Sequence, residues 1–143
     1  MFSKSNLLAG LAGGLAHFFL GYLIYGILTR DFFASHSVAS DAMRAEGSEI
    51  MLYIALGALI QGFLMATLYS KWARGIHSAK GGFEFGALIG IFVGFGIGLL
   101  NYGVMNLSDL TGHLADGVIS IIFFGLVGLV IALVYKATSK KEV

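Results

Sequence analysis

Four long apolar stretches alternate with polar connections along the chain. Each stretch is long enough to cross a hydrocarbon core of about 30 Å, which takes about 20 helical residues. None has the alternation of apolar and polar residues that is typical of membrane β-strands. The pattern predicts an all-α integral membrane protein, a single domain whose four transmembrane helices form an up-down bundle. The predicted spans are residues 6–29, 50–70, 82–105 and 117–135, with a longer outer loop at residues 30–49.

The composition narrows the class of protein further. Of the 143 residues, 57% are hydrophobic and 12% are charged, whereas soluble domains carry about 25% charge. The absence of cysteine excludes disulfides, a cysteine nucleophile and thiolate metal sites. Proline, the commonest cause of a sharp helix kink, is also absent, so we expect unbroken spans. The first span exceeds the 7–15-residue core of a signal peptide, and we expect it to be retained.

Charged residues predict the orientation in the membrane. Because short cytoplasmic loops are enriched in lysine and arginine, the side with most of these residues is assigned to the cytoplasm. One side carries Lys4, Lys71, Arg74, Lys80, Lys136, Lys140 and Lys141, and the other carries Arg30 and Arg44. This distribution predicts that both termini lie on the cytoplasmic side of a bacterial inner membrane. Tyr69, Trp72 and Tyr135, next to the inner lysines, are expected to form an interfacial aromatic belt.

Two repeated patterns suggest that one helical hairpin is used twice. The run Gly21–Gly26 resembles Gly98–Gly103 at an offset of 77 residues, since both contain glycine, tyrosine and glycine near the outer end of a span. Glycine, alanine and tyrosine at 62, 66 and 69 recur at 128, 132 and 135, an offset of 66. Both copies would start and end on the same side of the membrane, so a duplication would give parallel repeats. Chance identity in a chain rich in glycine and leucine is the alternative explanation.

Glycine occurs at every fourth position of the third span, and small residues also mark the first two spans. In lipid, such stripes let helix backbones approach closely, so tight packing within the chain or in a dimer is the favoured interpretation. A sliding or gating surface, or a groove for a ligand, is the alternative. The residues expected to pack helices are Gly82, Gly86, Gly90, Gly94, Gly98, Gly14, Gly21 and Gly62.

Two polar residues lie near the middle of predicted spans. His17 is on the glycine face of the first span, and Gln61 lies at a similar depth in the second. Unpaired polar groups are costly in hydrocarbon, so a hydrogen bond between the two side chains is expected. The functional alternative is that His17 responds to protons or contacts a substrate, because histidine titrates near neutral pH.

Other polar residues lie near the ends of the spans. Glu84 is expected to pair with Lys80 or to favour the positive end of its helix. Asn101 and Tyr102 either line an outer vestibule or bond across the bundle to Tyr25 or Ser120. The candidates for a pocket or gate are Tyr25, Asn101, Tyr102 and Glu84.

Acidic residues and histidine also recur in the outer connections. Asp109, His113 and Asp116 have a spacing that places them on one helical face, and His36, Asp31 and Asp41 lie in the other outer loop. A divalent cation suits such ligands. Capping of the last helix by Ser108, Asp109 or Thr111, together with solvation, is the favoured interpretation, so no metal is expected.

No catalytic motif accompanies these residues. The sequence lacks the zinc-protease pattern His-Glu-x-x-His, a nucleophile elbow and a phosphate-binding loop, so we expect neither an enzyme nor a cofactor. Gly21-Tyr22-x-x-Tyr25-Gly26, the Phe32-Phe33 pair and a glycine-rich last helix resemble uncharacterised families of small four-span bacterial membrane proteins. That resemblance implies the fold and no assigned activity.

The favoured function is therefore a non-enzymatic one, in helix packing, protein interaction or as an accessory subunit. The expected partners are the lipid bilayer and a second copy or a larger membrane protein, with no nucleic acid. The alternative is a small transporter or channel-like protein whose path passes His17, Gln61 and the glycines of the third span.

Overall fold

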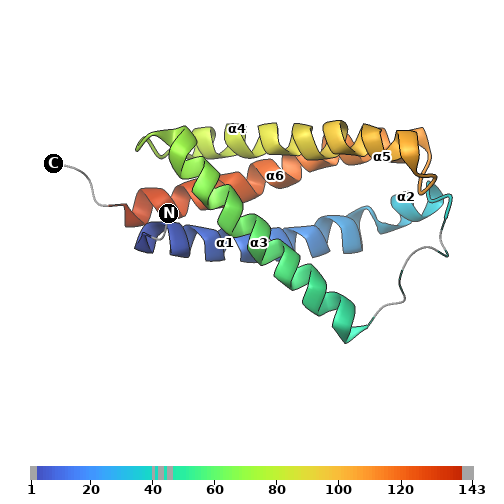
Figure 1. Ribbon diagram of the computed structural model, residues 1–143, viewed down its shortest axis with the longest axis horizontal. Coiled ribbons are helices and arrows are strands. Elements are labelled where there is room, and N and C mark those ends of the chain that lie inside the picture. Colours follow the sequence, from blue (N-terminus) through green and yellow to red (C-terminus); the bar gives the residue numbers. More distant parts are fainter. Residues whose placement is uncertain (1–2, 40, 42–43, 45–46, 140–143) are drawn as a thin grey trace.

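The computed structural model describes residues 3–39, 41, 44 and 47–139, and helices dominate this part of the chain (Figure 1). The elements are α1 (Lys4–Gly21), η1 (Tyr22–Leu28), α2 (Arg30–Ser35), α3 (Ser48–Ala73), α4 (Ala79–Gly90), η3 (Ile91–Ile97), α5 (Gly98–Val104) and α6 (Leu110–Thr138), where η1 and η3 are π-helical. Four continuous helical segments are long and apolar enough to span a membrane: Lys4–Leu28, Ser48–Ala73, Ala79–Val104 and Leu110–Thr138. The predictions of an all-helical fold and of four such helices are confirmed.

The helix ends follow local capping. Ser3 and Ser78 accept hydrogen bonds from backbone amides of the first turns of α1 and α4, at 3.1 and 3.0 Å. Helix α6 begins seven residues before the predicted span, because Asp109 caps it and the helix continues through Gly112. The loop predicted at residues 30–49 contains the short helix α2, and residues 40, 42–43 and 45–46 of this loop lie outside the described residues. The end of the bundle at which this loop lies is called the outer end below, and the opposite end, where α1 begins and α6 ends, is called the inner end.

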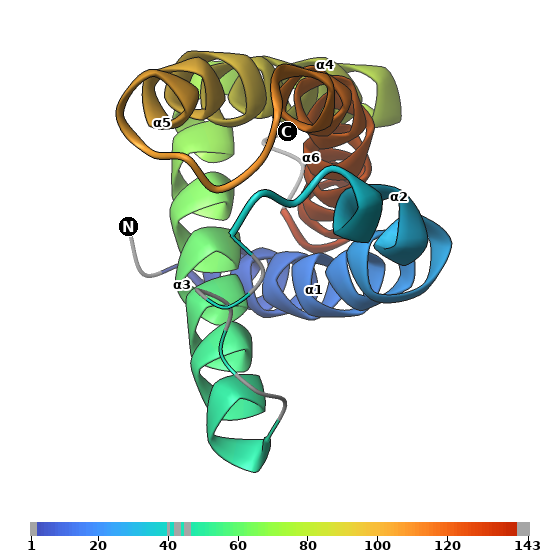
Figure 2. The same cartoon turned by 90° about the vertical axis from the view of Figure 1, so that its right-hand side faces the viewer.

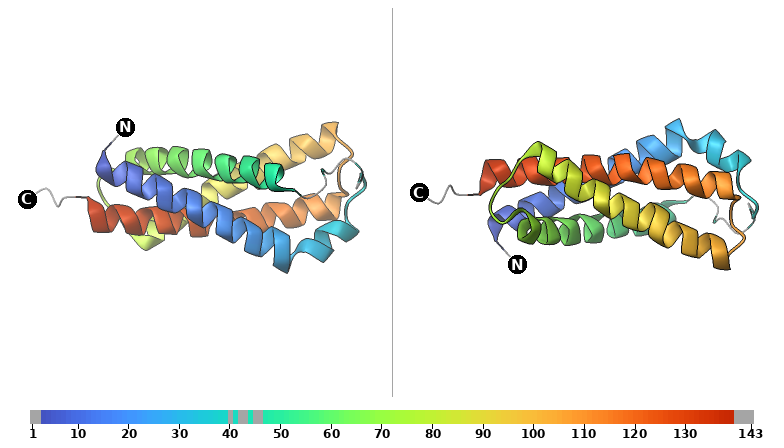
Figure 3. Two further views of the ribbon diagram at one scale, coloured as in Figure 1. Left: turned by 90° about the horizontal axis from the view of Figure 1, so that it is seen from below. Right: turned by 90° about the horizontal axis from the view of Figure 1, so that it is seen from above.

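Helix α6 is central to the bundle. Figure 1 shows α6 between α1 and α4, and the two views of Figure 3 show α3 crossing α1 on one face and α4 crossing α6 on the other. The most apolar 18-residue stretch of α6 has a mean hydropathy of 2.9, and 50% of its residues are buried. In the corresponding stretch of each of the other three spans, 22% of the residues are buried. The most apolar helix therefore forms the core against which the others pack.

The glycines of the third span bring its backbone against α6. A methyl group added at Gly86 would lie 2.7 Å from the carbonyl carbon of Phe124, and one at Gly90 would lie 2.7 Å from the Cα of Ile121. Both distances are too short for any side chain. Gly98 differs, because a methyl group there would approach only its own helix, at 3.9 Å. The glycines in close contact with α6 are Gly82, Gly86, Gly90 and Gly94.

Helices α1 and α3 cross in the same way. A methyl group added at Gly62 would lie 2.7 Å from the carbonyl oxygen of Gly10, and it would also clash with the backbone of Gly14. In the other pair, a methyl group at Gly128 would meet the carbonyl oxygen of Gly82 and the backbone of Gly86. The glycine contacts of α1 with α3 therefore match those of α4 with α6.

The positions that match differ in register from the pattern that the sequence suggested. Positions 10 and 14 correspond to 82 and 86, an offset of 72 in the first helix of each hairpin, whereas the sequence pattern gave 77. The offset of 66 between Gly62 and Gly128 agrees with the prediction. The pattern at the outer ends misled because its glycines are not needed for close packing: a methyl group added at Gly98 would meet no other helix within 4 Å, and one added at Gly103 would meet nothing within 4 Å.

The outer half of α3 leaves the bundle. All buried residues of α3 lie between Ala58 and Ala73, and none of residues 48–57 is buried. Figure 2 shows the first turns of α3 well away from the other helices. The first hairpin is thus closed only at its inner half, whereas α6 in the second hairpin is covered along most of its length.

Candidate functional site

The structure separates the two mid-span polar residues. His17 lies with its ring edge-on to Phe123 and Phe124, at centroid distances of 4.7 and 5.5 Å, and its Nδ1 atom is buried without a hydrogen-bond partner. Gln61 is exposed on α3. The predicted hydrogen bond between them is not formed. Gly62 faces α1, and one residue turns a helix by about 100°, so the neighbouring Gln61 points away from the contact.

The candidates of the outer half occupy two separate places. The Tyr25 hydroxyl lies 3.4 Å from Ser120 Oγ, and the Tyr25 ring packs edge-on to Phe123. Tyr102 instead packs edge-on to His113, with centroids 5.4 Å apart. Tyr25 and Ser120 thus pair with each other across the bundle.

The remaining candidates of the third span, Asn101 and Glu84, are not buried. Asn101 is half-buried, and its backbone carbonyl accepts a hydrogen bond from Met105. Glu84 is exposed and lies 3.7 Å from Lys80 Nζ, one turn earlier in α4. The predicted pairing of Glu84 with Lys80 is confirmed. An exposed pair of this kind contributes little to stability.

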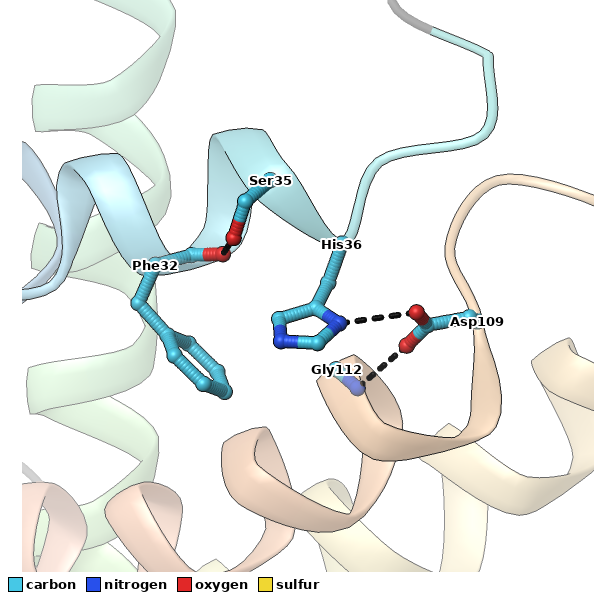
Figure 4. Close-up of polar contacts among 5 residues, drawn as sticks. All are labelled: Phe32, Ser35, His36, Asp109 and Gly112. Atoms are coloured by element: carbon cyan, nitrogen blue, oxygen red, sulfur yellow. Dashed lines mark hydrogen bonds and ion pairs between the residues drawn. The ribbon is translucent and has the colours of Figure 1, made fainter.

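An outer clasp joins the two outer connections, formed by residues 36–38 and 107–109 (Figure 4). His36 Nδ1 lies 2.7 Å from one carboxylate oxygen of Asp109, whose other oxygen accepts the Gly112 amide at 2.8 Å. Backbone bonds add to it: the Val38 amide donates to the Leu107 carbonyl at 2.9 Å, and the Asp109 amide donates to the His36 carbonyl at 3.0 Å. The sequence indicated a cap at Asp109, and it did not identify His36 as the partner.

Asp109, the first candidate for a metal ligand, has its hydrogen-bond partners in the clasp. The hydrogen bond from His36, followed by that from Gly112, holds the pKa of Asp109 below its ordinary value. In the part of the chain that the structure describes, no three histidine, aspartate or glutamate side chains converge in an arrangement able to hold a metal ion. Asp109 bonds to His36, and His113 packs on Tyr102, so these residues have other contacts.

An inner cluster links the inner ends of the helices, and the sequence did not reveal it. The Tyr135 hydroxyl of α6 donates to Asn6 Oδ1 of α1 at 2.6 Å and lies 3.1 Å from the carbonyl oxygen of Ala66 in α3. Asn6 Nδ2 donates in turn to Thr67 Oγ1 at 3.2 Å. These buried polar contacts tie three helices together, and each satisfied pair avoids the cost of an unpaired buried group.

Aromatic rings extend the inner cluster. Tyr69 and Tyr135 are 0% and 4% exposed and therefore pack inside the bundle, whereas Trp72 is 46% exposed. The His77 ring, in the connection between α3 and α4, stacks on Tyr135 at 4.9 Å and 17° and lies 5.6 Å from Tyr69. Burial lowers the pKa of His77. The tyrosine repeated at an offset of 66 is the sequence signal from which this cluster could have been predicted.

The comparisons with known proteins give no relative: no protein-family model, no curated protein and no solved structure matches the chain.

Proposed function

We propose that the chain is a multi-pass protein of a bacterial inner membrane that acts as a non-enzymatic interaction module or accessory subunit. Its four spans run alternately up and down, with both termini in the cytoplasm and the clasp of residues 36–38 and 107–109 outside. The hairpin is duplicated, a proposal that the matching glycine crossings at Gly62 and Gly128 support. The observation that carries the function is that apolar side chains and close backbone contacts at the glycines fill the interior while Gln61 faces outward.

The closed interior argues against a path for polar solutes. Such a path needs polar groups along its length. Gly86 and Gly90 lie directly against the α6 backbone, which leaves no space at these positions. The half-buried His17 ring is in contact with the Phe123 and Phe124 rings, and its buried Nδ1 atom has no hydrogen-bond partner.

A flux assay tests this function. The purified protein is reconstituted into liposomes and assayed for flux of protons, metal cations, amino acids and amphipathic cations, alongside the variants His17→Ala and Gln61→Leu. We expect no flux above that of protein-free liposomes in any of the three. Flux that is present in the original protein and lost in His17→Ala would overturn the proposal in favour of a small transporter with its path at His17.

A further inference from the structure

A stripe on α3 has the spacing of a helix–helix seam. It consists of Ile50, Ile54, Gly57, Gln61, Leu64 and Leu68, with alternating intervals of four and three residues. This is the spacing at which one helix packs along another with a small crossing angle. Ile54, Leu64 and Leu68 are 51%, 58% and 51% exposed, and a methyl group added at Gly57 would meet nothing within 4 Å. The stripe has no partner helix in the described part of the chain.

Gln61 makes this face unfavourable as a surface for lipid alone. It is the fourteenth of the 26 residues of α3, which places it near the middle of the span. Its amide can donate two hydrogen bonds and accept two, and lipid tails offer none. An exposed amide at this depth is stabilised when another helix supplies a hydrogen bond.

In the second hairpin, the equivalent positions of α6 are buried. At the offset of 66, Gln61 corresponds to Val127, which is 0% exposed, and Gly57 corresponds to Phe123, which is 4% exposed. Ile54 corresponds to the buried Ser120. Three positions of this face that are buried inside the molecule in α6 are therefore uncovered in α3, and one of them carries the polar residue.

We infer that the stripe is the interface of a homodimer in which the α3 helices of two copies pack side by side about a two-fold axis along the membrane normal. That axis places each stripe residue opposite its own equivalent at the same depth. The Gln61 amide is both donor and acceptor, so it is complementary to the same amide of a second copy. The stripe contains no charged residue that would repel its equivalent. The inference rests on the proposed interaction function and names its partner.

Single cysteines test the geometry, since the chain has none of its own. Gly57→Cys and Leu64→Cys lie on the stripe. Leu56→Cys and Leu52→Cys are controls on the other side of α3, at positions that are 47% and 58% exposed. In liposomes at low protein density, a mild oxidant is expected to produce disulfide-linked dimers from the two stripe variants and few from the controls. Equal cross-linking at Gly57 and Leu56 would indicate random collision and overturn the inference.

The variants Gln61→Leu and Gln61→Asn test the role of the amide. Dimer fractions are measured by single-molecule photobleaching of labelled protein in liposomes, with helix content followed by circular dichroism. Loss of one interhelical hydrogen bond is expected to raise the dissociation constant about three- to thirtyfold in Gln61→Leu. Gln61→Asn, which keeps an amide, is expected to lose less. A Gln61→Leu variant that dimerises as well as the original protein would contradict the inference.

The two proposals fail in different ways. A chain that is monomeric in liposomes and carries no solute refutes the homodimer while leaving an interaction with a different protein. A chain that dimerises through the stripe and also carries a solute refutes the proposed function while leaving the homodimer.

Discussion

Residues of one type have different roles in this protein because their neighbours differ. His36 bonds to a carboxylate in the outer clasp, His17 contacts two phenylalanine rings, and His77 stacks on Tyr135 at the inner end of the bundle. Of these, His77 lies outside the spans and has a buried Nδ1 atom without a hydrogen-bond partner. Protonation of His77 would place a charge in that aromatic environment, so it is expected to destabilise the folded chain.

We predict that the inner cluster loses stability in mild acid through His77. Burial lowers its pKa from 6.5, so the unfolded chain takes up this proton before the folded chain does. Stability therefore falls as the pH drops from 6.5 towards the folded pKa. His77→Phe keeps a stacked ring and removes the titration. Thermal unfolding in detergent at pH 7.5 and pH 5.5 should show a smaller loss of Tm in His77→Phe than in the original protein; equal losses would refute this role.

At the scale of the helices, a regular spacing of glycines does not by itself mean that each glycine packs closely against a neighbouring helix. Gly86 and Gly98 belong to the same every-fourth-residue series, yet an added methyl group would overlap α6 only at Gly86. The helix axis of the third span diverges from α6 towards its outer end, as Figure 3 shows. The same substitution should therefore have opposite consequences at the two positions.

Gly86→Ala is predicted to destabilise the protein by about 1–3 kcal/mol, because the added methyl group overlaps the backbone of α6 at Phe124. Gly98→Ala is predicted to be neutral or to stabilise the protein by up to about 1 kcal/mol. Alanine favours a helix, and the added methyl group would meet nothing outside its own helix within 4 Å. Reversible unfolding in mixed micelles measures both. A destabilisation of the same size at Gly98 would show that the spacing, and not the contact, matters.

The sequence predicted the four helices well because length and hydropathy determine them almost alone. It predicted close packing at Gly14, Gly62 and Gly86 for the same reason, since small residues at helical spacing allow backbones to meet. It did not predict which residues face each other across helices. The expected bond from His17 to Gln61 fails because a shift of one residue rotates a side chain by about 100°, which depth alone does not reveal.

At the scale of the molecule, two hairpins with matching glycine crossings form a whole that is not symmetric. Tyr69 and Tyr135, equivalent at an offset of 66, meet with ring centroids 5.8 Å apart at the inner end, where the two hairpins are joined. Towards the outer end, α6 stays covered and α3 diverges. The asymmetry leaves a face of α3 uncovered, which is the face proposed to pack against a second copy, and the orientation of the chain determines which side of the membrane the open end faces.

The distribution of basic residues predicts the orientation of the chain in the membrane. Seven of the nine lysine and arginine residues lie on the side of both termini, so the open end of α3 should face away from the cytoplasm. Ser35→Cys and Val104→Cys probe the outer side, and Ile76→Cys and Ala137→Cys probe the inner side, all without changing the charges that set the topology. In spheroplasts, a membrane-impermeant maleimide should label the first pair, and the second pair only after the membrane is permeabilised. The reverse pattern would invert the orientation, and labelling of all four in intact spheroplasts would mean that the chain inserts both ways, which the strong bias of its basic residues opposes.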